Sequence, residues 1–149
     1  MTRRLLTLCV TILAFCSTLT SKAENPKPFV IPELRYWNGG EGALSIGNVT
    51  KVFYTDASLS IAAEEFADDY GLLFGKGLKA KAIKANGKTP DGSIVLNLVN
   101  DPELGEEGYS IEIGDIVTIN AQTVTGAYWS TRTLLQILEQ NKGSQLPKG

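Results

Sequence analysis

The chain has 149 residues, with 14 Lys and Arg, 16 Asp and Glu, and no His. Without histidine it lacks the commonest general base near neutral pH, together with His-ligated zinc and every Ser–His or Cys–His nucleophile pair. Any hydrolysis by these residues would have to use carboxylates.

Residues 1–23 have the three parts of a secretory signal. They begin with Arg3 and Arg4, continue with an apolar run over residues 5–15, and end on a small residue, Ala23, where we predict cleavage. The apolar run is shorter than the roughly twenty residues that a membrane-spanning helix needs, and no second apolar stretch follows. We therefore expect an exported protein, periplasmic or extracellular, without a transmembrane segment.

Both cysteines, Cys9 and Cys16, lie inside the predicted signal, so a mature chain starting at Glu24 has no thiol for disulfides, catalysis or metal binding. Cys16 leaves one alternative open. The sequence before it partly matches a bacterial lipoprotein signal, with Phe15 where a small residue is usual. In that case the protein would be lipid-anchored at Cys16.

The predicted signal contains three basic residues and no acidic ones, so the mature chain keeps 11 basic and 16 acidic residues, a formal charge of −5. No basic cluster stands out along the sequence. Binding to nucleic acid depends on Lys and Arg that neutralise phosphates. We therefore predict no nucleic-acid partner.

The mature chain is expected to form one domain, residues 30–149, after a short proline-containing linker, residues 24–29. Its first strand is predicted over residues 30–37, at a sheet edge because Pro32 cannot donate to a ladder. A glycine-rich turn leads to two short strands, residues 43–46 and 49–55, which we expect to pair with each other.

From Leu59 the apolar period changes from two to about 3.6, which predicts an amphipathic helix that ends near Gly75. Ser58 or Ser60 could cap its start. The predicted buried face consists of Leu59, Ala62, Ala63, Phe66, Tyr70 and Leu73.

Strands are predicted next over residues 78–85 and 93–99, joined by a turn, and then a tight hairpin over residues 109–113 and 116–120. A last helix should run from about residue 125 to 140. Its predicted buried face consists of Ala127, Thr131, Leu134 and Leu138, flanked by Tyr128 and Leu135. The short connections favour antiparallel pairing, so the expected fold is α+β, a mostly antiparallel sheet with two main helices on one face.

Two acidic pairs were considered as candidate catalytic groups. Asp68 and Asp69 are neighbours on the first helix, where side chains point about 100° apart and cannot converge on one substrate. Glu106 and Glu107 lie in a glycine-flanked loop, where a charged turn is the simpler interpretation. Gly75-Lys76-Gly77 lacks the rest of a phosphate-binding loop and is interpreted as a helix stop. We predict no catalytic, cofactor-binding or metal-binding residue.

Aromatic side chains offer the other route to a binding function. Trp37, Tyr128 and Trp129 could stack on sugar rings. Packing in the core or against a partner domain is the competing interpretation, and it is favoured for all three.

Several segments in order resemble the N-terminal accessory domain of family 20 glycoside hydrolases, the β-N-acetylhexosaminidases. They are an Ile-Pro motif at Ile31-Pro32, a helix over residues 62–70, a strand over residues 93–98, a hairpin that begins Gly108-Tyr109, and a helix with a Gly…Thr-Leu-x-Gln pattern, Gly126 to Gln136. The resemblance covers residues 30–149. It implies that a catalytic barrel, absent from this chain, is the partner of the domain.

In that family the barrel carries an adjacent Asp-Glu pair, and the acetamido group of the substrate serves as the nucleophile. None of those positions exists here, so no catalytic residue can be carried over. The resemblance implies a non-catalytic domain of an enzyme that removes terminal N-acetylhexosamine from glycans, either truncated or encoded apart from its barrel. Related domains also precede other sugar-hydrolase barrels. The alternative is a free-standing carbohydrate-binding or interaction module that uses Trp37 or the last helix.

Overall fold

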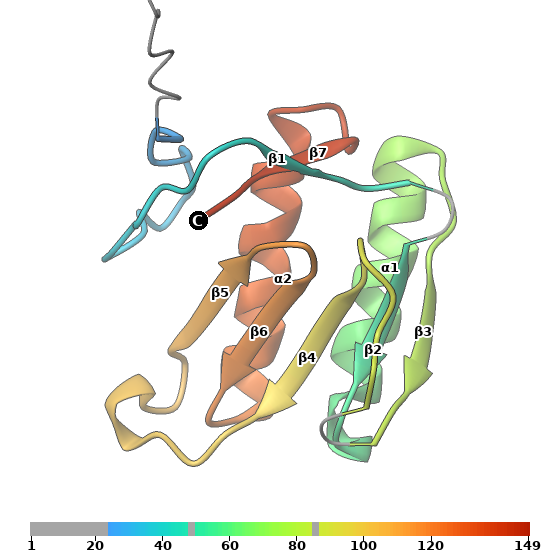
Figure 1. Ribbon diagram of the computed structural model, residues 1–149. Helices are drawn as coiled ribbons and strands as arrows, with labels where there is room; N and C mark the ends of the chain where they lie inside the picture. The colour runs from blue at the N-terminus through green and yellow to red at the C-terminus, as the bar shows by residue number, and fades with distance from the viewer. Residues whose placement is uncertain (1–23, 48–49, 85–86) are drawn as a thin grey trace, which may run out of the picture.

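The computed structural model describes residues 24–47, 50–84 and 87–149. Two helices lie together against one face of a five-stranded sheet, and a two-stranded sheet sits at one end (Figure 1). The predicted signal and both cysteines lie outside the described residues. The strands are β1 (Ala43–Ser45), β2 (Lys51–Tyr54), β3 (Lys79–Ala82), β4 (Ile94–Leu98), β5 (Tyr109–Ile113), β6 (Val117–Ala121) and β7 (Gln145–Pro147), and the helices are α1 (Ser60–Phe74) and α2 (Val124–Glu139).

The α+β class and the two helices on one face are confirmed, but the prediction of a mostly antiparallel sheet is wrong. The strand order is β3-β2-β4-β6-β5, and the pairs β2–β3, β2–β4 and β4–β6 are all parallel. Within this five-stranded sheet, as far as the structure describes it, only the hairpin β5–β6 is antiparallel. The reason lies in the connections: α1 returns the chain from the end of β2 to the start of β3, and the segment after β3 passes β2 and runs back along the length of the strands before β4 begins (Figure 1).

The predicted pairing of the first strands is also wrong. The strand expected over residues 30–37 is irregular backbone, and β1 pairs with β7 rather than with β2. Strand β7 follows the last helix and was not predicted, because its three residues are too few to show a period. The turn expected between β1 and β2 includes residues 48–49, which lie outside the described residues.

Helix α1 buries most of its predicted face, and the exception is at its end. Leu73 is 56% exposed, and Phe74, one position further along the helix, packs against the core in its place. The predicted serine cap is wrong as well. A 3₁₀ turn (Ala57–Leu59) precedes the helix, and Asp56 caps that turn by accepting a hydrogen bond from the Ser58 backbone N–H. Gly75 ends the helix as predicted, in the left-handed conformation at φ 68°.

Helix α2 buries every residue of its predicted face. Its first turn is capped by Thr123, whose hydroxyl accepts a hydrogen bond of 3.0 Å from the Gly126 N–H. Thr131 is the one polar member of that face, and its hydroxyl donates to the Tyr128 carbonyl at 2.7 Å. The helix therefore enters the core without an unpaired hydroxyl at this position.

The segment predicted as a linker is extended, yet it is hydrogen-bonded to the domain. The Asn25 N–H donates to the Gly40 carbonyl, and the Asn25 side-chain amide donates to the Lys148 carbonyl. The Gln136 side chain accepts from the Ile31 N–H at 2.9 Å and donates to the Ile31 carbonyl at 3.0 Å. Both ends of the described chain are thus joined, and Gln136 holds the N-terminal segment along α2.

Close backbone approach at Gly126 leads to a first prediction. An added Cβ there would lie 2.5 Å from the Gly108 carbonyl oxygen, a backbone atom that cannot rotate away. We expect Gly126→Ala to lower the free energy of unfolding by about 1–3 kcal/mol, although alanine is the better helix former. Chemical denaturation of the purified chain measures this.

The matched control is Gly71→Ala in the interior of α1. The nearest atom to a Cβ at that position is the Lys76 carbonyl oxygen at 3.8 Å, an ordinary contact. This change should raise stability by about 0.5–1 kcal/mol. Equal effects of the same sign at both glycines would contradict the packing described for Gly126.

Candidate functional site

The two acidic neighbours on α1 diverge, as predicted. Asp68 is exposed on the outer surface of the helix, whereas Asp69 is turned toward α2 and forms an ion pair with Arg132. Asp68 is therefore a surface carboxylate, whereas Asp69 takes part in a contact between the helices. Arg132 was not among the residues predicted from the sequence. Its spacing of four residues from Tyr128 was the available signal, because residues i and i+4 are neighbours on a helix surface.

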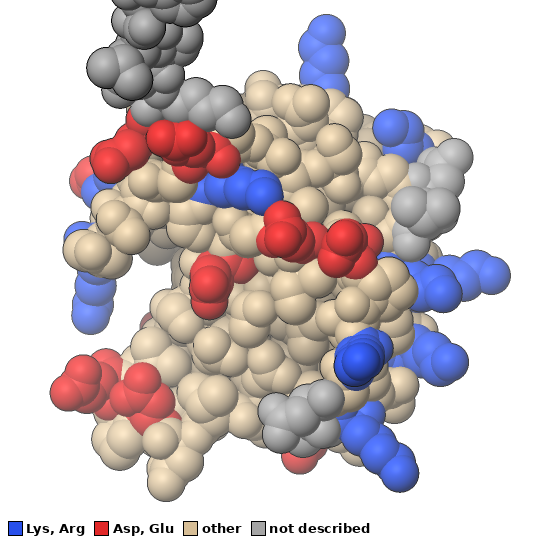
Figure 2. Space-filling model, viewed as in Figure 1, with Lys and Arg blue, Asp and Glu red and all other residues tan. Residues whose placement is uncertain are grey.

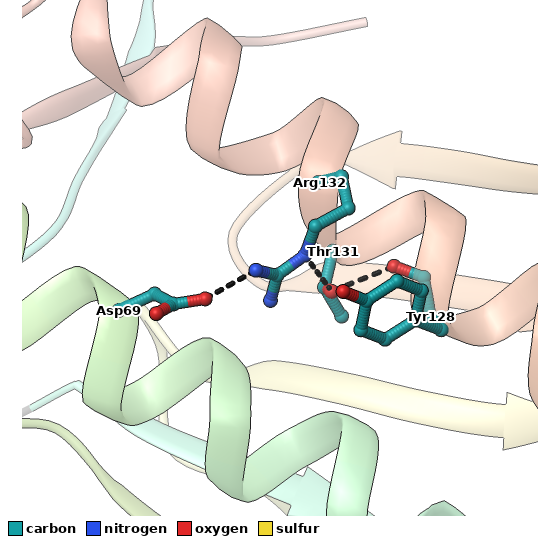
Figure 3. A network of polar contacts seen from close by, with 4 residues as sticks. All are labelled: Asp69, Tyr128, Thr131 and Arg132. Atoms are coloured by element: carbon teal, nitrogen blue, oxygen red, sulfur yellow. Dashed lines mark hydrogen bonds and ion pairs between the residues drawn. The ribbon is translucent and has the colours of Figure 1, made fainter.

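A polar network bridges the two helices (Figure 3). The Arg132 guanidinium donates through Nη1 to Asp69 and through Nε to the Thr131 hydroxyl at 3.1 Å. It also lies over the Tyr128 ring, 4.8 Å from the ring centroid. Its remaining nitrogen, Nη2, is buried and has no hydrogen-bond partner among the described residues.

Tyr128 and Trp129 extend this network with aromatic surface. Their rings meet edge to face, with centroids 5.4 Å apart, and Trp129 is 45% exposed. Trp129 therefore does not lie in the core of this domain. Two interpretations of Trp129 remain: its ring stacks on a sugar, or it packs against a partner domain.

Trp37 is placed differently. It is half-buried, and its indole N–H donates to the Asn25 carbonyl at 2.9 Å. A Cβ added at Gly149 would lie 2.5 Å from the ring, so the indole packs directly against the C-terminal segment. Packing, rather than sugar binding, is the role that these contacts support for Trp37.

The remaining candidates have local structural roles. Glu106 and Glu107 are exposed, and the Glu106 carbonyl accepts a hydrogen bond from the hydroxyl of Thr123, the residue that caps α2. In the ranges that the structure describes, no three Asp, Glu, His or Cys side chains gather in an arrangement that could hold a metal ion. Residues 75–77 form the helix stop and the connection to β3, as expected.

The candidate site is the outward surface of the helix pair, which we call the helix face. It consists of Ile61, Asp68 and Leu72 on α1 and Tyr128, Trp129 and Arg132 on α2. Ile61 and Leu72 are 66% and 84% exposed. Exposed aliphatic and aromatic groups around an arginine are the composition of a protein-binding surface, since Trp, Tyr and Arg dominate interface energetics.

Carboxylates outside the helix face lead to a second prediction, on pH. A hydrogen bond from Lys148, aided by its charge, lowers the pKa of Asp115, and hydrogen bonds from Ser58 lower the pKa of Asp56. Because the folded-state pKa values lie below the unfolded value of 3.8, these groups stabilise the fold above pH 3.8, and this contribution is lost as the pH falls through the folded pKa.

No histidine is available to titrate near pH 6. We therefore expect the midpoint of thermal unfolding to be flat between about pH 5 and pH 8 and to fall only below about pH 4. A scan of thermal unfolding against pH measures this. A transition centred near pH 6.5 would contradict it.

No helix within the described ranges is both long and apolar enough to cross a membrane. A family model described as glycosyl hydrolase family 20, domain 2, matches residues 27–149. The lacto-N-biosidase of Bifidobacterium bifidum is 30% identical to this chain over 131 residues, which cover 87% of this chain but 11% of that protein.

Solved structures give the same result. The N-acetyl-β-hexosaminidase of Streptomyces plicatus superposes with a TM-score of 0.63 at 25% identity, over 85% of this chain and 26% of the other. A β-N-acetylglucosaminidase of Vibrio harveyi shares the fold, with a TM-score of 0.57 at 15% identity, over 77% of this chain and 17% of the other. The chain thus spans about a quarter or less of the length of these proteins. The chain belongs to the family called glycosyl hydrolase family 20, domain 2, which is an accessory domain of hexosaminidase-like enzymes.

Proposed function

We propose that this chain is the non-catalytic N-terminal domain of a secreted β-N-acetylhexosaminidase, an enzyme that removes terminal N-acetylhexosamine residues from glycans. Its role is to pack against the catalytic barrel of that enzyme. By itself it hydrolyses nothing. The family match and the related enzymes support the enzyme class, and the much greater length of those enzymes supports a separate catalytic partner.

The observation that carries the proposal is the helix face. Trp129, Ile61 and Leu72 expose large apolar side chains there, on the sides of the helices that do not pack against the sheet. Exposed apolar groups that gather on one side of a domain mark a surface that another element covers. The catalytic barrel is the partner that the family supplies.

Arg132 gives this surface a polar anchor. Its side chain is 23% exposed, and one of its nitrogens is buried without a partner in the isolated chain. A buried, unpaired donor costs about 1–3 kcal/mol, or more when it is charged. A carbonyl or carboxylate oxygen of the barrel, placed against Nη2 by a small turn of the guanidinium, would complete its hydrogen bonding. We therefore assign Arg132 the role of orienting the domain on its barrel.

The N-terminal segment extends the same surface. The Gln136 side chain donates a hydrogen bond to the Ile31 carbonyl, and the Gln140 side chain donates one to the Phe29 carbonyl. The side chains of Ile31 and Phe29 themselves are 70% and 76% exposed. Glutamine amides on α2 thus fix the backbone and leave the apolar side chains free to contact a partner. This gives the Ile-Pro motif and the Gln of the last helix a joint role in docking.

A dye-binding experiment on the chain alone tests the helix face. We expect a fluorescent hydrophobic dye to bind the purified chain, and Trp129→Ala to weaken that binding, since it removes the largest exposed ring of the helix face. Tyr36→Ala is the matched control, because Tyr36 is 80% exposed but lies on neither helix. Absence of dye binding, together with monomeric behaviour at high concentration, would contradict an uncovered docking surface.

A further inference from the structure

Lysines gather on the face of the sheet that the helices do not cover. Ala80 and Val52 point toward the helices, so their neighbours Lys79, Lys81 and Lys51 point to the opposite face. Lys51 and Lys79 are direct partners in the parallel ladder. Figure 2 shows basic side chains gathered on the β3 side of this face and acidic ones on the β5 side. The sequence-based statement that no basic cluster is present is therefore wrong.

These lysines have no acidic partners. The three ion pairs among the described residues involve Lys27, Lys148 and Arg132, and none involves a lysine of this group. Residues 71–100 contain five lysines and one acid, Asp91. The sequence of residues 1–23, 48–49 and 85–86, which the structure does not describe, contains no Asp or Glu. Neighbouring parallel strands are about 4.8 Å apart, so the Lys51 and Lys79 side chains start close together and repel each other.

Protection of a sheet edge does not explain the group. Lysines on an edge strand prevent unwanted strand pairing, and this accounts for Lys79 and Lys81 on β3. Lys51, however, lies on an interior strand, and Lys84 lies on the connection that crosses the open face. Four like charges from three segments thus lie along one side of β2 and β3, and edge protection does not account for all of them.

A hollow with polar and apolar lining lies beside Lys84. It has a volume of about 150 Å³ and is lined in part by Lys84, Thr55, Asn97 and Thr118. The Thr55 hydroxyl donates to the Asn97 side chain at 3.1 Å, and Asn97 donates to Asn120 at 3.1 Å. This row of hydroxyl and amide groups provides donors and acceptors next to positive charge.

The chemistry of this surface favours an acidic polysaccharide over other polyanions. None of the large exposed apolar side chains lies among these lysines, so the surface has nothing to insert into a bilayer. Acidic side chains, Glu112 and Asp115, lie at the other side of the same sheet, whose five strands span about 19 Å. A rigid nucleic-acid duplex laid over the lysines would meet those acids, whereas a single flexible glycan strand need not.

We infer that Lys51, Lys79, Lys81 and Lys84, with the adjacent hollow, form a binding site for an acidic polysaccharide. Uronate carboxylates pair with the lysines, and sugar hydroxyls bind the Thr55–Asn97 row. This site lies on the opposite side of the sheet from the helix face, and it does not require the proposed docking to a barrel. It gives the domain a way to hold an enzyme at an anionic polymer.

The test measures binding of the purified chain to polygalacturonate at low ionic strength, with neutral dextran as the comparison polymer. We expect binding to the polyuronate only, and we expect it to weaken as salt is added. Lys79→Gln with Lys81→Gln should weaken binding about tenfold, at the scale of exposed charge pairs. The control, Arg35→Gln with Lys142→Gln, removes the same charge from other surfaces and should leave binding unchanged.

Three outcomes would overturn the inference. The first is an equal loss of polyuronate binding in the control variant. The second is binding of anionic phospholipid vesicles or duplex DNA that is as tight as binding of the polyuronate. The third is displacement of the polyuronate by monomeric galacturonate that is as effective per carboxylate as displacement by the polymer. Dye binding measured on the same variants separates this site from the proposed function. Loss of polyuronate binding with intact dye binding would locate the effect on the lysine side of the sheet alone.

Discussion

Replacement of Tyr70 by alanine is expected to lower the free energy of unfolding by about 3–5 kcal/mol, the largest effect of any single change we predict. Tyr70 is fully buried, and its ring lies 4.9 Å from that of Phe74 and 6.4 Å from that of Phe66. Its hydroxyl donates to the Gly143 carbonyl, which joins α1 to the turn that follows α2. Alanine would leave a cavity and an unpaired carbonyl at once.

Tyr70→Phe separates these two contributions. It keeps the ring and removes the hydrogen bond, so we expect a loss of about 1–2 kcal/mol. Urea denaturation of both variants gives the two values. A loss below about 1 kcal/mol for the alanine variant would contradict the packing between the helices.

The same phenol has a diagnostic pH dependence. Burial raises the pKa of Tyr70 above its usual value of 10.0. The folded state therefore keeps the phenol neutral, and the stability that depends on it is intact below pH 10.0 and is lost as the pH rises through the higher folded pKa. Tyr70→Phe should remove this alkaline loss from the stability profile.

Trp129→Ala is expected to weaken association with the catalytic domain about thirtyfold or more, the loss that defines an interface hot spot. Trp129 combines a large exposed ring with edge-to-face contact to Tyr128, beside the Arg132 anchor. The measurement is titration of this chain with a separately expressed barrel encoded by the reading frame beyond the codon for Gly149. The Trp129 indole should also become protected from a soluble quencher on binding.

Two further variants make this prediction specific. Arg132→Lys keeps the positive charge but loses the planar guanidinium that reaches Asp69 and stacks on Tyr128, so it should also weaken association. Tyr36→Ala, at a more exposed aromatic that lies on neither helix, should not. If Trp129→Ala binds the barrel as tightly as the unchanged chain, the helix face is not the docking surface. Unrelated sequence beyond Gly149 would favour a free-standing role.

The elements with a strong local period were predictable from the sequence. Both helices show apolar residues at spacings of three and four, and the hairpin β5–β6 has a tight turn that forces antiparallel pairing. The direction of the other strands was not predictable in the same way. Short connections suggested hairpins, but the segment after β3 runs back across the sheet, and nothing in its composition reveals that path.

The candidate sites depended on contacts between distant segments, so the sequence revealed them only in part. Tyr128 and Trp129 were recognised as aromatic neighbours, but Arg132 gained its role from Asp69 on the other helix. The lysines were visible in part, because Lys79, Lys81 and Lys84 lie close together in the sequence but Lys51 does not. Lys51 and Lys79 are 28 positions apart along the chain, and only the parallel ladder makes them neighbours.

Assay of the purified chain with a chromogenic N-acetylglucosaminide is the most direct test that this domain assists an enzyme without being one. We predict no turnover at any pH, since a companion domain contributes surface rather than reacting groups. Turnover that follows the chain through clean purification, and disappears when an acidic residue of this chain is replaced by its amide, would contradict the proposal.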